Sequence, residues 1–255
     1  MMKLSVVIPA YNEAQNLPKT VEAIYSELTK EDIEHEILVS NDNSEDNTQE
    51  VIDALEKKYP TMRHVFNEKP NGYGYAVRKG LENFRGDCVV VTMADLSDDP
   101  KDIVKYYRKM EQTGCDMVFG SRWIKGAKVV DYPKQKLWLN RVVNHCIRIM
   151  FGFRYNDVTN GFKLFSKETM EGLKPFVSGQ FSFALELPLK AIIRGYSYEV
   201  VPNNWYNREL GESNLKIGKM MKRYLFVLLN CLNEKLFSMG DYKKGIYNAP
   251  RNKKK

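Results

Sequence analysis

The chain has 255 residues, enough for one large α/β domain or for a domain with an appendage. Its 43% hydrophobic and 28% charged residues are typical of an ordinary globular protein. The net charge of +7 is moderate and comes partly from the basic end, 251–255, so we expect no nucleic-acid partner.

The cysteines and the apolar runs bear on the compartment. The four cysteines lie far apart without paired metal-ligand spacing, which indicates a reducing compartment. The apolar run at 4–8 is too short for a secretory signal. The longest apolar-rich run, 224–232, is far below the roughly 20 residues of a spanning helix. We therefore expect a cytoplasmic chain that does not cross a membrane.

Residues 1–123 alternate short apolar runs with segments of helical spacing. The runs predict strands at 4–8, 37–39, 62–66, from 89, and at 116–120. A proline opens the helix predicted at 100–112. This alternation predicts α/β structure, with a Rossmann-like, mostly parallel central sheet flanked by helices.

The alternation stops after Lys125. Helices are predicted at 137–150, 183–193 and 216–237, and strands at 163–165 and 198–201. We expect one domain over 1–215, with halves of about 1–123 and 124–215. An amphipathic helix (216–240) and a basic tail (241–255) follow it.

Carboxylates recur where predicted strands end. Glu13, Asp42 and Asp95 each follow a strand, and parallel strands open their carboxyl ends onto one crevice. Recurrence at equivalent places favours a functional site, and carboxylates there suit a hard cation that carries phosphate oxygens. Asp98 and Asp99 are equally well explained as caps of the helix that follows them.

Seven stretches, in this order, resemble family 2 glycosyltransferases of the A-type fold. They are residues 6–13, 41–48, 71–81, 93–100, 120–122, 157–163 and 207–215. The last two make the chain most similar to the dolichol- or polyprenyl-phosphate mannosyl and glucosyl transferases. The glycines at 72 and 74 have neither dinucleotide nor P-loop spacing, which excludes those two nucleotide sites.

The resemblance implies a donor site in the first half of the chain. Pro9, Tyr11 and Glu13 line the nucleotide pocket, and Asp42 reads the base. Asp95 and Ser97 hold Mg²⁺ or Mn²⁺. The chain departs from the family pattern in two places: Met93 stands where the first metal-binding aspartate is usual, and Asn41 replaces the first of an aspartate pair.

The resemblance also implies an acceptor site in the second half. Arg122 and Arg208 bind phosphate and, with Asp95, carry the catalysis. Lys136, Asn140 and Ser213 complete the acceptor-phosphate site, with a solvated helix face as the alternative for Lys136. Arginine forks match phosphate oxygens, and an anionic leaving group needs fixed positive charge.

The implied reaction is inverting transfer of a hexose from GDP-mannose or UDP-glucose to a polyprenyl phosphate. A phosphate monoester, with a second pKa of about 6, is mostly anionic near neutral pH and needs positioning more than a general base. One alternative is a family 2 transferase that acts on a sugar hydroxyl in glycan, capsule or lipopolysaccharide assembly, with Asp157 or Glu186 as base. A second is a catalytically weak nucleotide-sugar-binding protein.

The helix at 216–240 begins with four cationic residues and carries a broad apolar face. Such a helix can lie in the headgroup region, so we expect a peripheral protein at the cytoplasmic face of a membrane. Residues 134–150 have a similar composition and offer a second contact. The alternatives for the same face are core packing, a homodimer interface or a membrane-anchoring partner subunit.

Overall fold

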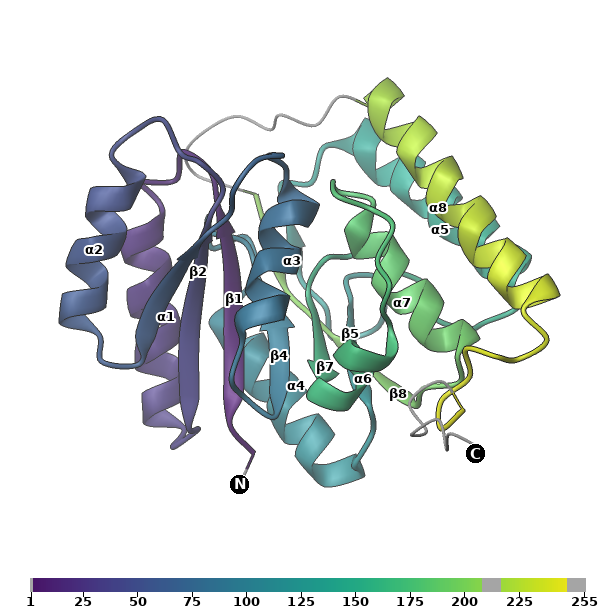
Figure 1. The fold of residues 1–255 in the computed structure, drawn as a ribbon, viewed down its shortest axis with the longest axis horizontal. Helices are drawn as coiled ribbons and strands as arrows, with labels where there is room; N and C mark the ends of the chain where they lie inside the picture. The colour runs from purple at the N-terminus through teal and green to yellow at the C-terminus, as the bar shows by residue number, and fades with distance from the viewer. Residues whose placement is uncertain (1, 208–216, 247–255) are drawn as a thin grey trace, which may run out of the picture.

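The computed structural model describes residues 2–207 and 217–246. A seven-stranded sheet in the order β3-β2-β1-β4-β7-β5-β8 forms its centre (Figure 1). The strands of this sheet are β1 (Leu4–Ala10), β2 (His35–Asn41), β3 (Met62–Phe66), β4 (Cys88–Val91), β5 (Met117–Ser121), β7 (Lys163–Ser166) and β8 (Tyr198–Pro202). A second sheet pairs β6 (Val129–Val130) with β9 (Trp205–Tyr206).

Helices cover both faces of the central sheet. One core lies under α1 (Leu17–Lys30), α2 (Thr48–Lys58) and α4 (Pro100–Thr113). The other core contains residues of α3 (Tyr73–Asn83), α5 (Lys134–Phe151), α6 (Lys167–Gly172), α7 (Phe183–Ile193) and α8 (Ile217–Phe237). These layers account for strands that are buried on both faces, as the continuous apolar runs predicted.

The strand directions confirm the predicted fold class. All neighbours in the large sheet run parallel except β7, which is antiparallel to both β4 and β5. The order reverses at β1, which lies between β2 and β4. Ligands of open α/β sheets bind outside the carboxyl ends of the strands at such a reversal. The acidic loops after β1, β2 and β4 are therefore at the expected edge.

The first strand is longer than its sequence predicted. It continues through Pro9 to Ala10, because the Ala10 carbonyl still accepts a hydrogen bond from the Asp42 backbone N–H at 2.9 Å. The short strands β6 and β9 were not predicted, since two residues carry no periodicity.

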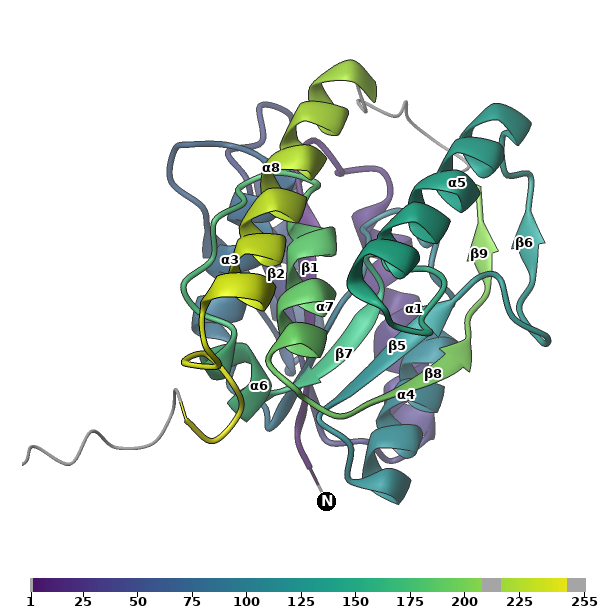
Figure 2. The same cartoon turned by 90° about the vertical axis from the view of Figure 1, so that its right-hand side faces the viewer.

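Helix α8 has two different faces. Tyr224, Val227 and Cys231 are buried in the core beside α7, whereas Leu225 and Phe226 on the other side are more than half exposed. Figure 2 shows α8 and α5 flanking α7 on one side of the molecule. Within the described ranges, no helix combines the length and the apolarity needed to cross a bilayer.

Candidate active site

The loops after β1 and β2 are bonded to each other. The parallel register sets Ala10 beside Asn41, so the residues that follow the two strands are neighbours. The Glu13 N–H donates to Thr48 Oγ1 at 2.9 Å, and Asn12 Oδ1 accepts from the Glu45 N–H at 2.8 Å. Two of the predicted nucleotide-pocket residues, Pro9 and Glu13, thus lie on a fixed edge, from which Tyr11 projects with 40% of its surface exposed.

Asp42 is held at the end of β2 by two hydrogen bonds. Its Oδ1 accepts from Asn67 Nδ2 at 2.6 Å and its Oδ2 from the Gly72 N–H at 2.7 Å. Burial raises the pKa of Asp42, and these two hydrogen bonds oppose the rise. The carboxylate therefore links β2 to the start of α3.

The glycines at the start of α3 permit close backbone packing. A Cβ on Gly74 would lie 2.5 Å from the backbone nitrogen of Gln180, and Gly72 has a φ of 147° that favours glycine. This packing explains a glycine-bearing turn that matched no nucleotide fingerprint. It also fixes Tyr73, whose ring stacks on Phe181 with centroids 4.6 Å apart.

Three carboxylates in the loop after β4 have different contacts, although the sequence left the roles of two of them open. Asp99 caps α4, since its side chain accepts from the Lys101 N–H at 3.0 Å. The Asp95 side chain accepts from the Ser97 N–H at 3.1 Å. Asp98 is only 7% exposed and lines a cavity instead of capping the helix. Burial raises the pKa of Asp98 to about 7, and the neighbouring charge of Asp95 contributes to the rise.

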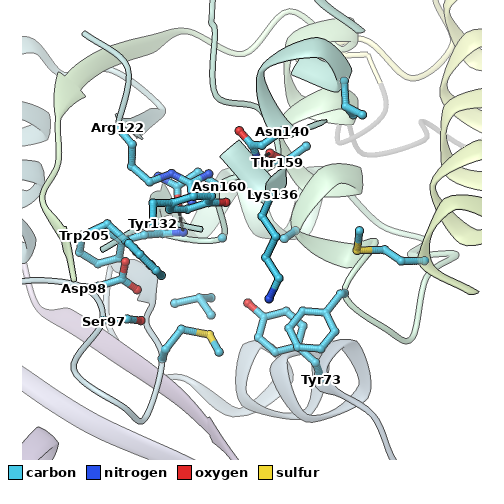
Figure 3. A pocket seen from close by; sticks show the side chains of 18 of the residues that line it. Tyr73, Ser97, Asp98, Arg122, Tyr132, Lys136, Asn140, Thr159, Asn160 and Trp205 are labelled. Atoms are coloured by element: carbon cyan, nitrogen blue, oxygen red, sulfur yellow. Dashed lines mark hydrogen bonds between the residues drawn. The ribbon is translucent and has the colours of Figure 1, made fainter. Parts of the chain in front are cut away.

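A cavity of about 240 Å³ opens at this edge of the sheet (Figure 3). Its polar lining includes Ser97 and Asp98 from the β4 loop, Arg122, and Lys136 and Asn140 from α5. Apolar side chains from α5, α8 and the loop before α7 line the rest: Leu139, Val143, Phe181, Met220, Met221 and Tyr224. The structure thus gathers predicted residues from both halves of the chain around one cavity.

The cationic side of the cavity is built on an ion pair. The Arg122 guanidinium contacts Asp157 through Nε to Oδ2 at 2.8 Å and Nη2 to Oδ1 at 2.7 Å. Asp157 is fully buried, and despite the burial of Arg122 the carboxylate raises the arginine pKa. Arg122 therefore stays charged at any ordinary pH.

Residues of α5 approach the cavity from the opposite side. Lys136 extends into it toward Tyr73 (Figure 3). Asn140 Nδ2 donates to Thr159 Oγ1 at 2.9 Å, and Asn144 Nδ2 donates to the same oxygen at 2.9 Å. These contacts anchor α5 to the turn at 157–163. The other predicted acceptor residues, Arg208 and Ser213, lie outside the described residues.

Two aromatic residues that the sequence did not predict line one side of the cavity. The rings of Tyr132 and Trp205 are 4.8 Å apart, and the Arg122 guanidinium lies 5.7 Å from the centre of the Tyr132 ring. Both aromatic residues line the cavity. They were missed because pairing of the short strands β6 and β9 brings them together across more than 70 residues.

The residues of the β4 loop fit a hard divalent cation. Asp95 and Ser97 offer carboxylate and hydroxyl oxygens, the ligand type that Mg²⁺ and Mn²⁺ prefer. Met93, which also lines the cavity, offers only a soft thioether. The donor set therefore suits the implied metal despite the missing first aspartate.

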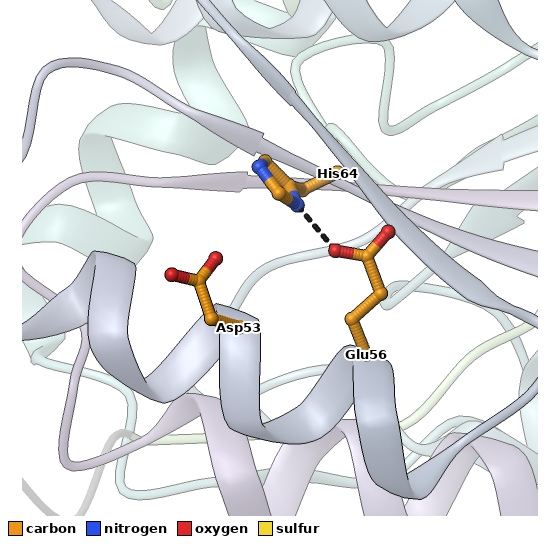
Figure 4. Close-up of side chains that lie close together, drawn as sticks. All are labelled: Asp53, Glu56 and His64. Atoms are coloured by element: carbon orange, nitrogen blue, oxygen red, sulfur yellow. Dashed lines mark hydrogen bonds and ion pairs between the residues drawn. The ribbon is translucent and has the colours of Figure 1, made fainter.

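A separate group, Asp53, Glu56 and His64, lies between α2 and β3 (Figure 4). Here His64 Nδ1 is 2.7 Å from Glu56 Oε2, and Gln49 Nε2 donates to Asp53 at 2.8 Å. None of these residues lines the cavity. Their hydrogen bonds account for the cluster as a surface network on the far side of the sheet.

Comparison with solved structures identifies the class of the fold. Glucosyl-3-phosphoglycerate synthase from Mycobacterium tuberculosis, solved with Mn²⁺ and uridine diphosphate, superposes with a TM-score of 0.68. The match covers 91% of this chain and 80% of that structure at 20% identity, so the likeness concerns the fold. The fold is that of the A-type glycosyltransferases.

The sequence comparisons then identify the family. The family model described as Glycosyl transferase family 2 matches residues 5–173, and this chain belongs to that family. A dolichol-phosphate mannosyltransferase of Pyrococcus furiosus is 34% identical over 88% of the chain, which spans 62% of that relative. A polyprenol monophosphomannose synthase of Mycolicibacterium smegmatis is 31% identical over 87% of the chain and 83% of the relative.

Proposed function

We propose that this chain transfers a hexose, with inversion, from a nucleotide-diphosphate sugar to a polyprenyl phosphate. The observation that carries the proposal is the cavity, which combines a cationic polar wall with an apolar wall from α5 and α8. An acceptor with a phosphate head and an isoprenoid tail has the same two-part chemistry. The names of the two sequence relatives support this acceptor and favour mannose as the sugar.

On the donor side, Pro9, Tyr11, Glu13 and Asp42 line the site for the nucleotide. Asp95 and Ser97 would hold a divalent cation, which supplies charge neutralisation for the departing diphosphate. The tuberculosis enzyme of the same fold was solved with Mn²⁺ and uridine diphosphate, which supports the pairing of a divalent cation with a nucleotide diphosphate. Arg122 has its charge fixed beside the same cavity, where a phosphate oxygen gains most from it.

On the acceptor side, the phosphate oxygen is itself the nucleophile. Lys136 neutralises and positions the phosphate head, with Arg122 across the cavity. Arg208 and Ser213 are proposed to complete this site on the basis of the family resemblance. No side chain has to remove a proton, because the monoester is already mostly anionic near neutral pH.

The alternative that transfers to a sugar hydroxyl needs a free carboxylate as base. Asp157 is buried and paired with Arg122. Glu186 is also buried, pairs with Lys190 at 2.6 Å, and accepts hydrogen bonds from the N–H groups of Val177 and Ser178. Both proposed bases are already engaged, which favours the phosphate acceptor.

The same face of the molecule suits a membrane surface. Helix α5 exposes 69% of Trp138 and 67% of Ile149, and α8 exposes Leu225, Phe226 and Leu229 by more than half. Lys219, Lys222 and Arg223 are exposed near the start of α8. We infer that this face lies in the headgroup region, next to the apolar side of the cavity.

The test is incubation of the purified protein with labelled GDP-mannose or UDP-glucose, Mg²⁺ or Mn²⁺, and a short-chain polyprenyl phosphate. The expected product is a lipid-linked hexose whose anomeric configuration is opposite to that of the donor. Product on an oligosaccharide but not on the lipid would favour the hydroxyl acceptor. Nucleotide-sugar binding without any turnover would favour the catalytically weak binding protein.

A further inference from the structure

Asp98 is a buried carboxyl group for which the proposed function has no use. Its carboxylate faces the cavity and is 7% exposed. The contacts it receives are a Met93 backbone N–H and a weak one, 3.5 Å, from the Thr92 hydroxyl. In the part of the chain that the structure describes, no cationic side chain forms an ion pair with it. Arg122 is near enough to lower its pKa but is bonded to Asp157.

Other buried aspartates nearby are fully satisfied. Asp102 is paired with Lys105 at 2.6 Å and also accepts from the Asn204 N–H at 2.6 Å. Asp157 holds the Arg122 fork. Burying a carboxylate without such partners is costly, and buried charges in proteins are normally paired or bound to metals. Asp98 is therefore the exception that calls for a ligand.

A structural role as helix cap does not explain Asp98. The adjacent Asp99 already caps α4 through the Lys101 N–H. The backbone of Asp98 is instead bridged to Trp205, and the Ser97 carbonyl accepts from the Tyr206 N–H at 3.0 Å. Strand β9 thus fixes this part of the β4 loop, and both Ser97 and Asp98 line the cavity (Figure 3).

We propose that Asp98 is a ligand of the divalent cation that accompanies the nucleotide diphosphate, and that it supplies the carboxylate absent at Met93. This rests on the proposed function, because that function brings a diphosphate to the β4 loop. Mg²⁺ is typically held by one or two carboxylates together with substrate phosphates, and a thioether is a poor ligand for it. Asp95 and Asp98 give the loop two carboxylates again, three residues apart in place of the usual two.

The experiment measures Mn²⁺ binding by electron paramagnetic resonance in the presence of GDP or UDP, with no acceptor and no transfer. The variants are Asp98→Asn and, as matched control, Asp99→Asn at the neighbouring cap. We expect Asp98→Asn to weaken Mn²⁺ binding about tenfold or more, the effect of losing about 1.4 kcal/mol. The control is expected to bind as the wild type does, within about twofold.

Thermal unfolding shows whether the variant folds. Without metal, Asp98→Asn is expected to unfold at the same temperature as the wild type or higher, because it removes a buried acidic group that forms no ion pair with the described side chains. With Mn²⁺ and nucleotide together, it is expected to gain less in unfolding temperature than the wild type gains.

The outcomes separate this inference from the proposed function. Equal Mn²⁺ affinity in Asp98→Asn and wild type overturns the inference and leaves the transferase proposal standing. The inference is also overturned if Asp98→Asn binds Mn²⁺ and the bare nucleotide as the wild type does but binds the nucleotide sugar more weakly. That result would assign Asp98 to the sugar. A wild-type protein that binds Mn²⁺ with neither nucleotide overturns the inference together with the proposed donor site.

Discussion

Arg122 and Asp157, 35 residues apart, form a two-pronged ion pair whose N–O distances are 2.8 and 2.7 Å. The backbone N–H of Arg122 donates to the same carboxylate at 3.0 Å. The two side-chain contacts fix the guanidinium in one orientation at the edge of the cavity, and the third holds the backbone beside it. The pair thus connects β5, which Arg122 follows, to the turn that leads into β7.

Replacing Asp157 by asparagine should lower both the stability of the protein and its transferase activity. The change leaves the buried Arg122 charge without its partner, which typically costs about 3–5 kcal/mol. We expect a lower urea midpoint and a fall in kcat, because the guanidinium loses its fixed orientation. Unchanged stability, with activity lost at every pH, would instead point to a role of Asp157 in proton transfer.

Asp95→Ala should remove activity without unfolding the protein. The proposed role of Asp95 is to hold the metal and diphosphate, so we expect transfer to fall by about 100-fold or more. Asp99→Ala provides the comparison, since losing the cap costs about 1 kcal/mol of stability and should spare the reaction. Transfer of radiolabelled sugar measures the activity of both variants, and thermal unfolding measures their stability. Near-normal turnover by Asp95→Ala would contradict the assignment.

Lys136→Gln should raise the KM for polyprenyl phosphate about tenfold, with little change in the KM for the donor, since it removes a charge that faces the acceptor phosphate. The side chain is otherwise exposed, so the fold should not change. Lys134→Gln, at the exposed start of the same helix, controls for a general loss of positive charge. Equal effects of the two substitutions would mean that Lys136 is a solvated surface residue and does not bind the acceptor phosphate.

Flotation with liposomes tests the membrane face. The wild type should bind vesicles rich in phosphatidylserine and release them at high salt. Reversing Lys219, Lys222 and Arg223 to glutamate should abolish binding, because each basic residue near such a surface contributes about 1 kcal/mol. Reversal of Lys57 and Lys58 on α2, which belongs to the opposite layer, should leave binding intact. Wild-type protein that stays soluble at low salt would make the exposed face a protein interface.

Glu36 provides a prediction on acid stability. Burial alone would raise its pKa, but hydrogen bonds from Ser5, Arg63 and the Arg85 N–H hold the pKa below its usual range. A lowered pKa means that Glu36 stabilises the fold above its unfolded-state pKa and loses this effect as the pH falls through the folded-state value.

Glu36→Gln should therefore lower the free energy of unfolding near neutral pH by about 1.5–3 kcal/mol, the usual contribution of hydrogen bonds to a charged group. The difference from wild type should shrink as the pH falls below about 4, where the unfolded glutamate becomes protonated. Urea titrations at several pH values measure it. A difference that stays constant down to the lowest pH would show that the charge of Glu36 contributes nothing.

Local sequence patterns were enough to predict the class of fold and the edge of the sheet that carries the site. Apolar runs and helical spacing are properties of short segments, and they predicted β3 and α7 with the bounds that the structure has. The strand ends followed from them, because parallel strands open their carboxyl ends to one side. This is why residues as distant as Glu13 and Asp95 could be assigned to one edge from the order of strands and helices alone.

The use of the side chains at that edge depends on tertiary packing. Asp98 and Asp99 are chemically identical neighbours, yet one accepts from the Lys101 N–H and the other lines the cavity. Tyr132 and Trp205 meet through strands too short to show any periodicity. In each case the role of the side chain depends on a contact between segments that only the packing of the whole sheet brings together. No local sequence pattern encodes such a contact.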